Sequence, residues 1–515
     1  MNTEAKKRRP KKSSLSVPNG NSNGNSSSME DKKLRRLRRK QNTQVMRKQK
    51  QQALIQGIIG GAVLVIIILT VLDKIFGEGE TARPKLPKNI KKKIMRPDLD
   101  NPSMDDGIGN TFQNMKNQLK RIGQYKHSDY MKNMGDHSPA YARLRQEYDE
   151  KLPYDASDPL SKQRIQNFVS SLHKRSYKNM MKQEMSYDIY NCPEFPLPEY
   201  PAAWNIKDVL DNWAPNDATP REYIYQGLCV FDYEKDYEKA LAYRAAEVPF
   251  VMRNDPRILR TVERWNQPHY IEKLLGDHTR YRTEYSPNNH FMYWMKPKKK
   301  AIKEGIVEKD WKPPTDMIRM PYKEWLGHAN VTDDKLGPDH EHWYFRLIGC
   351  GGMGRDCDKD SSEYLFDELP FFQPRSNNPL YMVDPKKQKG IHCRFGMKGV
   401  IAENHFDGSR NSIVLLGGER RYILSHPDQC ENLSLFPRGH PSARHSAVDW
   451  SNPDWAKFPK FSLAEVNEVV LQAGDLLYLP TNWFHFIISL ELNFQCNTRS
   501  GVEEKYMGAI SDCGF

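Results

Sequence analysis

The pattern of apolar and polar positions divides the chain into three parts. Residues 53–72 read ALIQGIIGGAVLVIIILTVL, twenty residues without a charge. Helical spacing with charged faces appears in Ala140–Leu152 and Leu160–Met181. From residue 187 onward, short β-like runs alternate with turn residues, which predicts a mainly antiparallel barrel or sandwich. The predicted strands are Tyr223–Phe231, Val248–Arg253, His290–Met295, His342–Ile348, Ile413–Leu416, Arg421–Leu424, Glu468–Leu471, Leu476–Leu479 and Phe486–Phe494.

The apolar segment 53–72 predicts a transmembrane helix. Twenty residues that rise about 1.5 Å each cross a hydrocarbon core of roughly 30 Å. A buried core helix is the alternative, but such helices seldom run this far without a charged face. A cleavable signal peptide is disfavoured, because 52 residues precede the segment and Leu72-Asp73-Lys74 offers no small-x-small cleavage site. We therefore expect a signal anchor that stays in the membrane from Ala53 to Leu72.

The distribution of charge predicts the orientation of this anchor. Residues 1–52 hold 16 Lys and Arg against three acids, whereas the rest of the chain holds 62 basic and 62 acidic residues. Nine Lys or Arg lie in residues 33–52 and six in residues 73–92, which favours a cytosolic tail and a luminal body. We expect a single-pass type II membrane protein of the endoplasmic reticulum or Golgi. Because the basicity belongs to the tail, no nucleic-acid partner is expected.

The cysteines agree with a luminal body. All eight follow the apolar segment: Cys192, Cys229, Cys350, Cys357, Cys393, Cys430, Cys496 and Cys513. An even number suits an oxidising compartment, although the pairing cannot be read from the sequence. Sequons at Asn330 and Asn432 are also on this side and predict a glycoprotein.

Four segments follow from these patterns. A disordered basic tail spans residues 1–52, and the anchor spans residues 53–72. A stalk and accessory helical region spans residues 73–185. A mainly β domain spans residues 186–515.

The candidate chemistry lies in the last 120 residues. His405 and Asp407 are two apart, so in a strand their side chains share one face. His485 ends the run GDLLYLPTNWFH, in which a strand, a proline and a returning segment could bring it beside the first two. Two histidines and one carboxylate form the facial triad that suits non-haem Fe(II). A bare His-x-Asp, however, is frequent and usually only satisfies surface hydrogen bonds.

The surroundings of these residues resemble a known family. The runs GMKGVIAENHFD, GGERRYILSHPDQ, HPSARHSAVDWSNPDWAKFP and GDLLYLPTNWFHF are similar to the jumonji-C branch of the cupin-fold 2-oxoglutarate-dependent oxygenases. The pattern most resembles the group that includes the asparaginyl hydroxylase of hypoxia-inducible factor. The resemblance is specific from Gly390 to Gly501, weaker from Val248 to Lys389, and absent from residues 1–185. It implies a double-stranded β-helix (jelly roll) with flanking helices.

The resemblance also implies a cofactor set and a reaction. Fe(II) would be held by His405, Asp407 and His485, with 2-oxoglutarate as cosubstrate and O₂ as oxidant. Oxidative decarboxylation of 2-oxoglutarate would then drive hydroxylation of a substrate C–H bond. No further catalytic residue is required beyond the metal ligands.

Several residues match the cosubstrate positions of the family. The family has a Lys two residues after a Gly, and Arg420 follows Gly418 in the same way. Arginine pairs a carboxylate bidentately, so the role is retained. Arg421 points the other way in a strand and is either a rival or an exterior charge.

Three further polar residues match the family pattern, and one residue departs from it. Asn411, Asn493 and Tyr344 match polar positions around the cosubstrate, and each could equally be a packed hydrogen-bonding residue. Ala402 stands where the family carries a Thr, so one hydrogen bond to the cosubstrate is missing.

Two functions follow as expectations. The first is an oxygenase that hydroxylates protein side chains in the secretory pathway. The second is a catalytically inactive cupin-fold binding module anchored in the membrane, and it is motivated by Ala402 and by Arg420 in place of the family's Lys. Histone demethylation is disfavoured, because the anchor separates the domain from chromatin. The sequence predicts neither the substrate residue nor the oligomeric state.

Overall fold

The computed structural model describes residues 139–515, except 182–184, 351–361 and 375–378. The predicted tail, the anchor and residues 73–138 of the predicted stalk lie outside this part, so the predicted boundaries there stay predictions. In the described ranges, no helix has both the length and the apolar character needed to cross a membrane.

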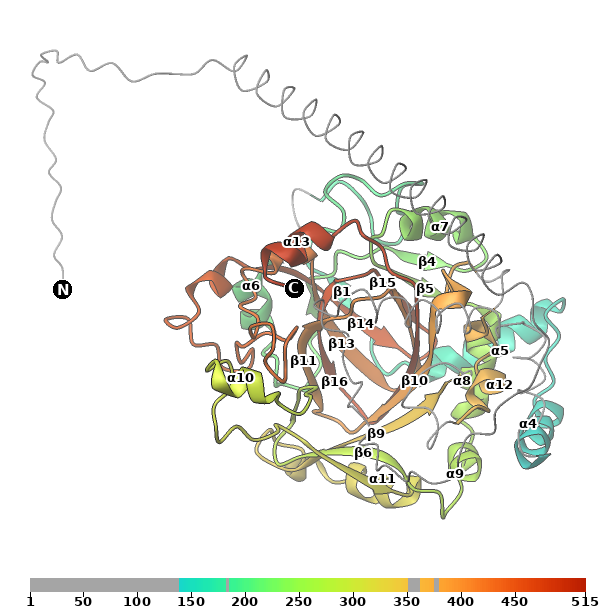
Figure 1. Cartoon of the computed structure of the whole chain (residues 1–515). Coiled ribbons are helices and arrows are strands. Elements are labelled where there is room, and N and C mark those ends of the chain that lie inside the picture. Colours follow the sequence, from blue (N-terminus) through green and yellow to red (C-terminus); the bar gives the residue numbers. More distant parts are fainter. Residues whose placement is uncertain (1–138, 182–184, 351–361, 375–378) are drawn as a thin grey trace, which may run out of the picture. The chain divides into compact units, whose positions relative to one another are not determined.

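Most of the described strands form two sheets that enclose the interior of the domain (Figure 1). The larger sheet has the order β4 (Val230–Asp232), β5 (Phe250–Arg253), β15 (Leu476–Leu479), β12 (Asn411–Gly417), β17 (Asn493–Ser500), β10 (Gln388–Gly396), β9 (His342–Gly349), β6 (Tyr281–Ser286) and β8 (Asp316–Met320). The smaller has the order β2 (Trp204–Asn205), β14 (Glu465–Gln472), β13 (Glu419–Ser425), β16 (Phe484–Ser489), β11 (Ile401–Phe406) and β7 (His290–Phe291). Strands β1 (Lys178–Asn179) and β3 (Tyr223–Ile224) pair separately. The predicted mainly β fold is confirmed and is consistent with a cupin jelly roll.

The central strands are buried on both faces. Every residue of β12 and β13 is buried, so the simple alternation of apolar and polar positions is lost there. One cluster of apolar side chains draws its members from both sheets, including Ile413 and Leu477 of the larger sheet and Tyr422 and Ile487 of the smaller. These apolar contacts hold the two sheets together. Buried polar side chains therefore lie only at particular positions of the interior.

The helices lie outside the sheets (Figure 1). They are α4 (Pro139–Lys151), α5 (Pro159–Leu172), α6 (Ile206–Asn212), α7 (Tyr237–Ala245), α8 (Pro256–Trp265), α9 (Tyr270–Leu275), α10 (Lys299–Lys303), α11 (Tyr322–Ala329), α12 (Leu365–Glu368) and α13 (Met507–Asp512). Helix α8 begins at a capping Asp255 followed by Pro256, a favoured helix start. It contacts β12, and Asn266, the residue after the helix, donates a hydrogen bond to the carbonyl of Leu416 in that strand (2.7 Å).

Four predicted elements differ from the structure, and the first is the predicted strand His290–Met295, of which only His290–Phe291 forms β7. The helix predicted over Leu160–Met181 ends at Leu172, because His173 is extended and its Nε2 contacts the carbonyl of Ala473 at 2.7 Å. The run Phe486–Phe494 is not one strand but parts of β16 and β17, joined by a turn that contains no Gly or Pro. The run Tyr223–Phe231 is likewise divided between β3 and β4.

Disulfides tie distant parts of the domain together. The described pairs are Cys192–Cys229, Cys393–Cys496 and Cys430–Cys513. Cys350 is also disulfide-bonded, and no cysteine in the described ranges is free. Cys393 and Cys496 are register partners on β10 and β17, so this bond links two central strands of the larger sheet.

Candidate metal centre

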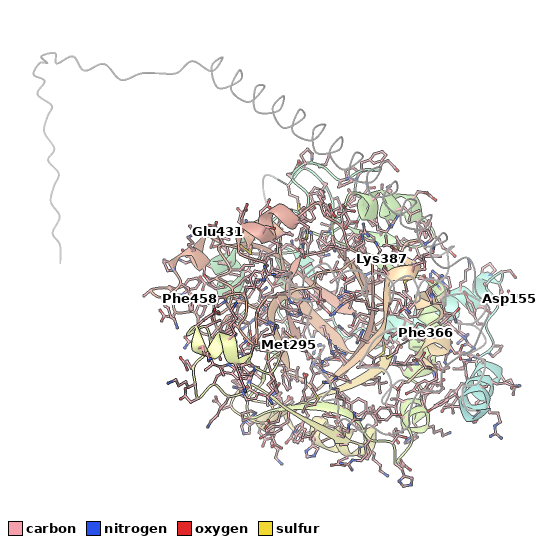
Figure 2. The ribbon with its side chains drawn as sticks, in the orientation of Figure 1. Asp155, Met295, Phe366, Lys387, Glu431 and Phe458 are labelled. Carbon is pink, nitrogen blue, oxygen red and sulfur yellow. A yellow bond between two sulfur atoms is a disulfide. The ribbon has the colours of Figure 1, made fainter. Side chains whose placement is uncertain are left out.

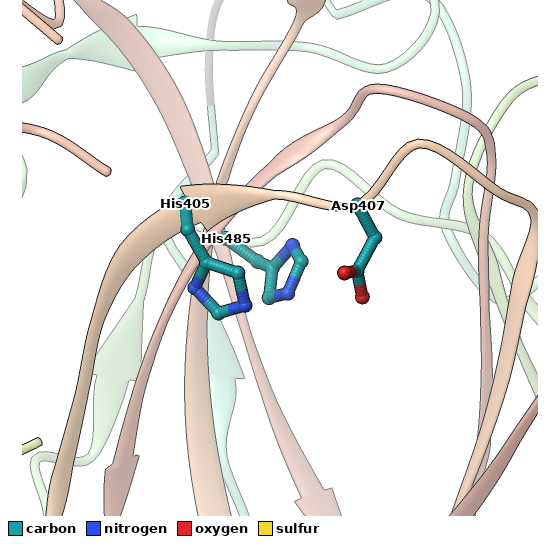
Figure 3. A group of neighbouring side chains, drawn as sticks. All are labelled: His405, Asp407 and His485. Carbon is teal, nitrogen blue, oxygen red and sulfur yellow. The ribbon is translucent and has the colours of Figure 1, made fainter. Parts of the chain in front are cut away.

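Strand pairing brings the predicted triad together. Strands β11 and β16 are antiparallel neighbours, and His405 lies directly opposite His485. Asp407 follows the end of β11, and its carboxylate points into the same space as the two imidazole rings (Figure 3). One ligand atom from each of the three residues lies within 4.8 Å of the other two. In the described ranges, this is the one group of His, Cys, Asp or Glu residues arranged so that it could hold a metal ion.

Backbone carbonyls fix the orientation of both imidazoles. Nδ1 of His405 lies 2.7 Å from the carbonyl oxygen of Glu403, and Nδ1 of His485 lies 3.1 Å from that of Trp483. A carbonyl oxygen only accepts, so Nδ1 carries the hydrogen in both rings. Each Nε2 is therefore left with a lone pair to offer to a metal, the usual arrangement of metal-bound histidines.

The carboxylate of Asp407 is held by two donors on neighbouring strands. Arg499 of β17 pairs with its Oδ2 at 2.7 Å, and the amide of Asn411 donates to the same oxygen at 3.2 Å. Burial by itself would raise the pKa of Asp407, but the guanidinium of Arg499 holds it well below its usual range. Oδ1 is then the oxygen available for a metal.

The pKa shifts of the three residues favour the protonation states that bind a cation. Burial lowers the pKa of both His405 and His485, and for His405 the neighbouring imidazoles of His485 and His445 add to this effect. Both rings are therefore neutral at pH 7, while Asp407 is ionised. Metal ligation requires neutral imidazole and carboxylate, so the donor set fits a divalent iron ion.

A buried guanidinium lies in the same interior. Arg420 of β13 is fully buried and contacts the amide oxygen of Asn493, the hydroxyl of Tyr344 (3.1 Å) and the carbonyl of Arg394 (3.3 Å). No carboxylate in the described ranges forms an ion pair with it. A buried charge without a counter-ion is costly, so the site fits one end of a dicarboxylate. Three of the four predicted cosubstrate residues are thus adjacent.

The fourth, Asn411, lies in the metal region. It is buried, donates to Asp407 and accepts a hydrogen bond from the amide of Asn497 (2.9 Å). Ala402 pairs with Ile487 in β16 and packs against the interior apolar cluster, so the site of the missing Thr faces the interior.

Arg421 is not an exterior charge. It points to the other side of β13, but it is fully buried there and pairs with Glu468 at 2.6 Å. Its guanidinium also lies over the ring of Trp213 at 4.3 Å from the centroid. The exterior reading fails because both faces of β13 are covered, and a residue already paired in this way is no rival to Arg420.

The sequence prediction missed Arg499, and it assigned His445 only to structure or substrate contact, not to the metal centre. Arg499 is six residues after Asn493, so period two along β17 puts both on one face, which is a signal that could have identified it. His445 is buried and stacks on His405, with ring centroids 4.9 Å apart. It comes from a loop, and no spacing rule relates it to the triad.

Comparisons with known proteins agree with this geometry. The chain matches the family described as "Cupin-like domain" over residues 238–498. It is 34% identical over 220 residues to lysine-specific demethylase 8 of Xenopus tropicalis, covering 40% of this chain and 49% of that protein.

Two further relatives carry different names. JmjC domain-containing protein D of Dictyostelium discoideum is 33% identical over 200 residues, covering 34% of this chain and 45% of that protein. Human tRNA wybutosine-synthesizing protein 5 is 27% identical over 159 residues, covering 31% of this chain and 47% of that protein. The chain thus spans about half the length of these relatives. Because the family match covers half of the chain, this protein belongs to the cupin-like domain family, with JmjC proteins among its relatives.

Proposed function

We propose that this protein is an Fe(II)- and 2-oxoglutarate-dependent oxygenase that hydroxylates protein side chains. The observation that carries the proposal is the group His405, Asp407 and His485, whose ligand atoms lie within 4.8 Å of one another in a buried interior. The iron, when bound, supplies the activation of O₂ and 2-oxoglutarate that oxidises the substrate C–H bond.

The remaining interior residues bind and orient. Arg420 would pair with the distal carboxylate of 2-oxoglutarate, with Tyr344 and Asn493 fixing the guanidinium plane. Arg499 and Asn411 hold Asp407 with one oxygen directed to the metal. The apolar cluster between the sheets limits the entry of water, which strengthens each of these charge interactions.

The second part of the proposal concerns the cellular location of the protein. Residues 53–72 would anchor the chain in the endoplasmic reticulum or Golgi membrane, with the oxygenase domain in the lumen and the basic tail in the cytosol. The described disulfides support this, because such bonds persist in oxidising compartments. The substrate would then be a protein of the secretory pathway.

The proposal is tested with purified full-length protein. We expect Fe(II)-dependent consumption of 2-oxoglutarate and formation of succinate, lost in His405→Ala and in Asp407→Ala. A matched control is His328→Ala, which removes an imidazole that stacks on Trp343 and not on the triad. Turnover that persists in both triad variants would contradict the proposal.

The alternative is an inactive binding module, which the absence of a Thr at Ala402 favours. It predicts neither tight metal binding nor 2-oxoglutarate binding. A titration of the full chain with Fe(II) and then 2-oxoglutarate, under anaerobic conditions, separates the two. Binding of both compounds excludes this alternative.

A further inference from the structure

Positive charge is concentrated between the exposed segment at α10 and the interior beside the metal centre. Residues 296–312 hold seven lysines and three acids, whereas the chain beyond its basic tail is neutral overall. Lys296, Lys298 and Lys299 are exposed, and none of them forms an ion pair with a described residue. Such an uncompensated local excess attracts anions.

This segment contacts the loop that approaches the metal centre. The amide of Met295, labelled in Figure 2, donates to the carbonyl of Pro441 (3.0 Å), and Trp311 packs edge-on against His440. Along the same loop, His445 stacks on His405. The lysines at α10 are therefore linked through residues 437–445 to the triad.

Two arginines of the loop 437–445 add positive charge between α10 and the metal centre. Arg438 is exposed, and Arg444 is partly buried with its guanidinium over the ring of Phe406. Arg444 has a φ of 73°, a left-handed conformation that is unfavourable for arginine. Strain of this kind concentrates at functional sites. No described carboxylate pairs with either arginine.

Arg394 of β10 is a further cation of the interior. It is the register partner of Arg346 on β9 and of Gln495 on β17, so its side chain is on the face that carries Asn493 and Tyr344. Its guanidinium donates only to the carbonyl of Cys393 (3.3 Å) among the described residues. Burial, and then repulsion from Arg346, lowers the pKa of Arg394 to about 9, as expected for a cation without a counter-ion.

The nearby carboxylates are already engaged. Asp407 pairs with Arg499, and Glu284 pairs with Arg346. Glu403 pairs with His290. A dicarboxylate cosubstrate bound at Arg420 would therefore leave two groups of cations without an anion: Arg394 and Arg444, and the exposed Lys296, Lys298 and Lys299.

We propose that these residues bind an acidic segment of the polypeptide substrate, rich in Asp and Glu, and lead it to the metal centre. This inference rests on the proposed function, because it names the substrate class of the same site. Guanidinium and ammonium groups at separate positions suit separate carboxylates along an extended chain. A nucleic acid is disfavoured, because of the three aromatic residues Tyr293, Trp294 and Trp311 only Tyr293 is exposed, whereas the two tryptophans pack edge-on against each other.

The test compares short fluorescent peptides on the purified full-length protein by anisotropy. We expect the Asp/Glu peptide to bind, Ser/Gly and Lys/Ser peptides of equal length not to bind, and added salt to weaken the complex. The double variant Lys298→Glu/Lys299→Glu should lower the affinity about tenfold. The matched control is Lys235→Glu/Lys273→Glu, two exposed lysines on the β4–α7 connection and on α9, which should leave the affinity unchanged.

The basic tail also attracts anions, so the site of binding is mapped directly. A photo-crosslinking version of the acidic peptide should label residues 294–312 or 437–445. Labelling confined to residues 1–52, equal loss in both double variants, or tighter binding of single-stranded RNA at the same residues would each overturn the inference.

Turnover of 2-oxoglutarate without peptide is measured in the same preparations. Turnover without any preference for the acidic peptide contradicts the inference and spares the proposed function. Preferential binding of the acidic peptide without any turnover of 2-oxoglutarate contradicts the proposed function.

Discussion

The charge state of Asp407 depends on Arg499, which pairs with it at 2.7 Å. Replacing Arg499 with Met should free the carboxylate to rotate and weaken metal affinity roughly 10- to 100-fold, as loss of such supporting contacts usually does. Anaerobic calorimetric titration with Fe(II) measures this. Arg499→Lys, which keeps a cation, should lose less. An affinity equal to that of the wild type in Arg499→Met would show that the pair does not support the ligand.

Ala402 offers a second test at the level of one side chain. Threonine at this position should add the hydrogen bond that the family provides and lower the KM for 2-oxoglutarate about fivefold. Ala402→Val is the matched control, because valine has the shape of threonine without the hydroxyl. Equal KM values for the two variants would show that the hydroxyl does not reach the cosubstrate.

Some residue roles could be predicted because a spacing rule governs them. His405 and Asp407 follow the period of a strand, and Arg420 follows a glycine in a family pattern. Arg421 could not be assigned, since the sequence does not show that Trp213 and Glu468 cover the outer face of β13. His445 could not be related to the triad, because a loop brings it there.

At the level of elements, the pairing of β11 with β16 makes the metal centre. The strand Leu476–Leu479 was predicted with the bounds of β15, because Gly474-Asp475 and Pro480 punctuate it. The turn between β16 and β17 was missed because Leu490, Glu491 and Leu492 contain no turn residue. β10 was not predicted because His392 and Arg394 interrupt its apolar pattern.

The disulfide between β10 and β17 closes a separation of 103 residues. Its removal in the double variant Cys393→Ala/Cys496→Ala should lower the free energy of unfolding by about 4 kcal/mol, since the unfolded chain loses a long-range constraint. Chemical denaturation of the full chain measures the change. Peptide mapping without reduction gives the control, because it should recover this pair and Cys192–Cys229. Free thiols at Cys393 and Cys496 in the purified full-length protein would contradict the pairing.

At the level of the whole molecule, buried histidines make stability depend on pH. Burial lowers the pKa of His392 to about 3 and that of His445 to about 4, and those of His405 and His485 also lie below the usual value. Between pH of about 6.5 and 4 the unfolded chain therefore binds more protons, so the free energy of unfolding falls as pH falls.

His290, whose pKa is raised because its contact with Glu403 outweighs burial, opposes this trend with a single proton. The Tm of the metal-free full chain should decrease steadily from pH 7 to pH 5. His445→Gln should show a shallower decrease. A Tm that is constant or rises over this range would contradict the burial of these imidazoles.

The account depends most on metal binding by three side chains. The direct measurement is the iron content of the full-length protein. The protein is loaded anaerobically with Fe(II), desalted and analysed by inductively coupled plasma mass spectrometry. We predict one iron per chain in the wild type and in His328→Ala, and loss of that iron in His405→Ala, Asp407→Ala and His485→Ala. Retention of one iron per chain in the three triad variants would contradict the central claim.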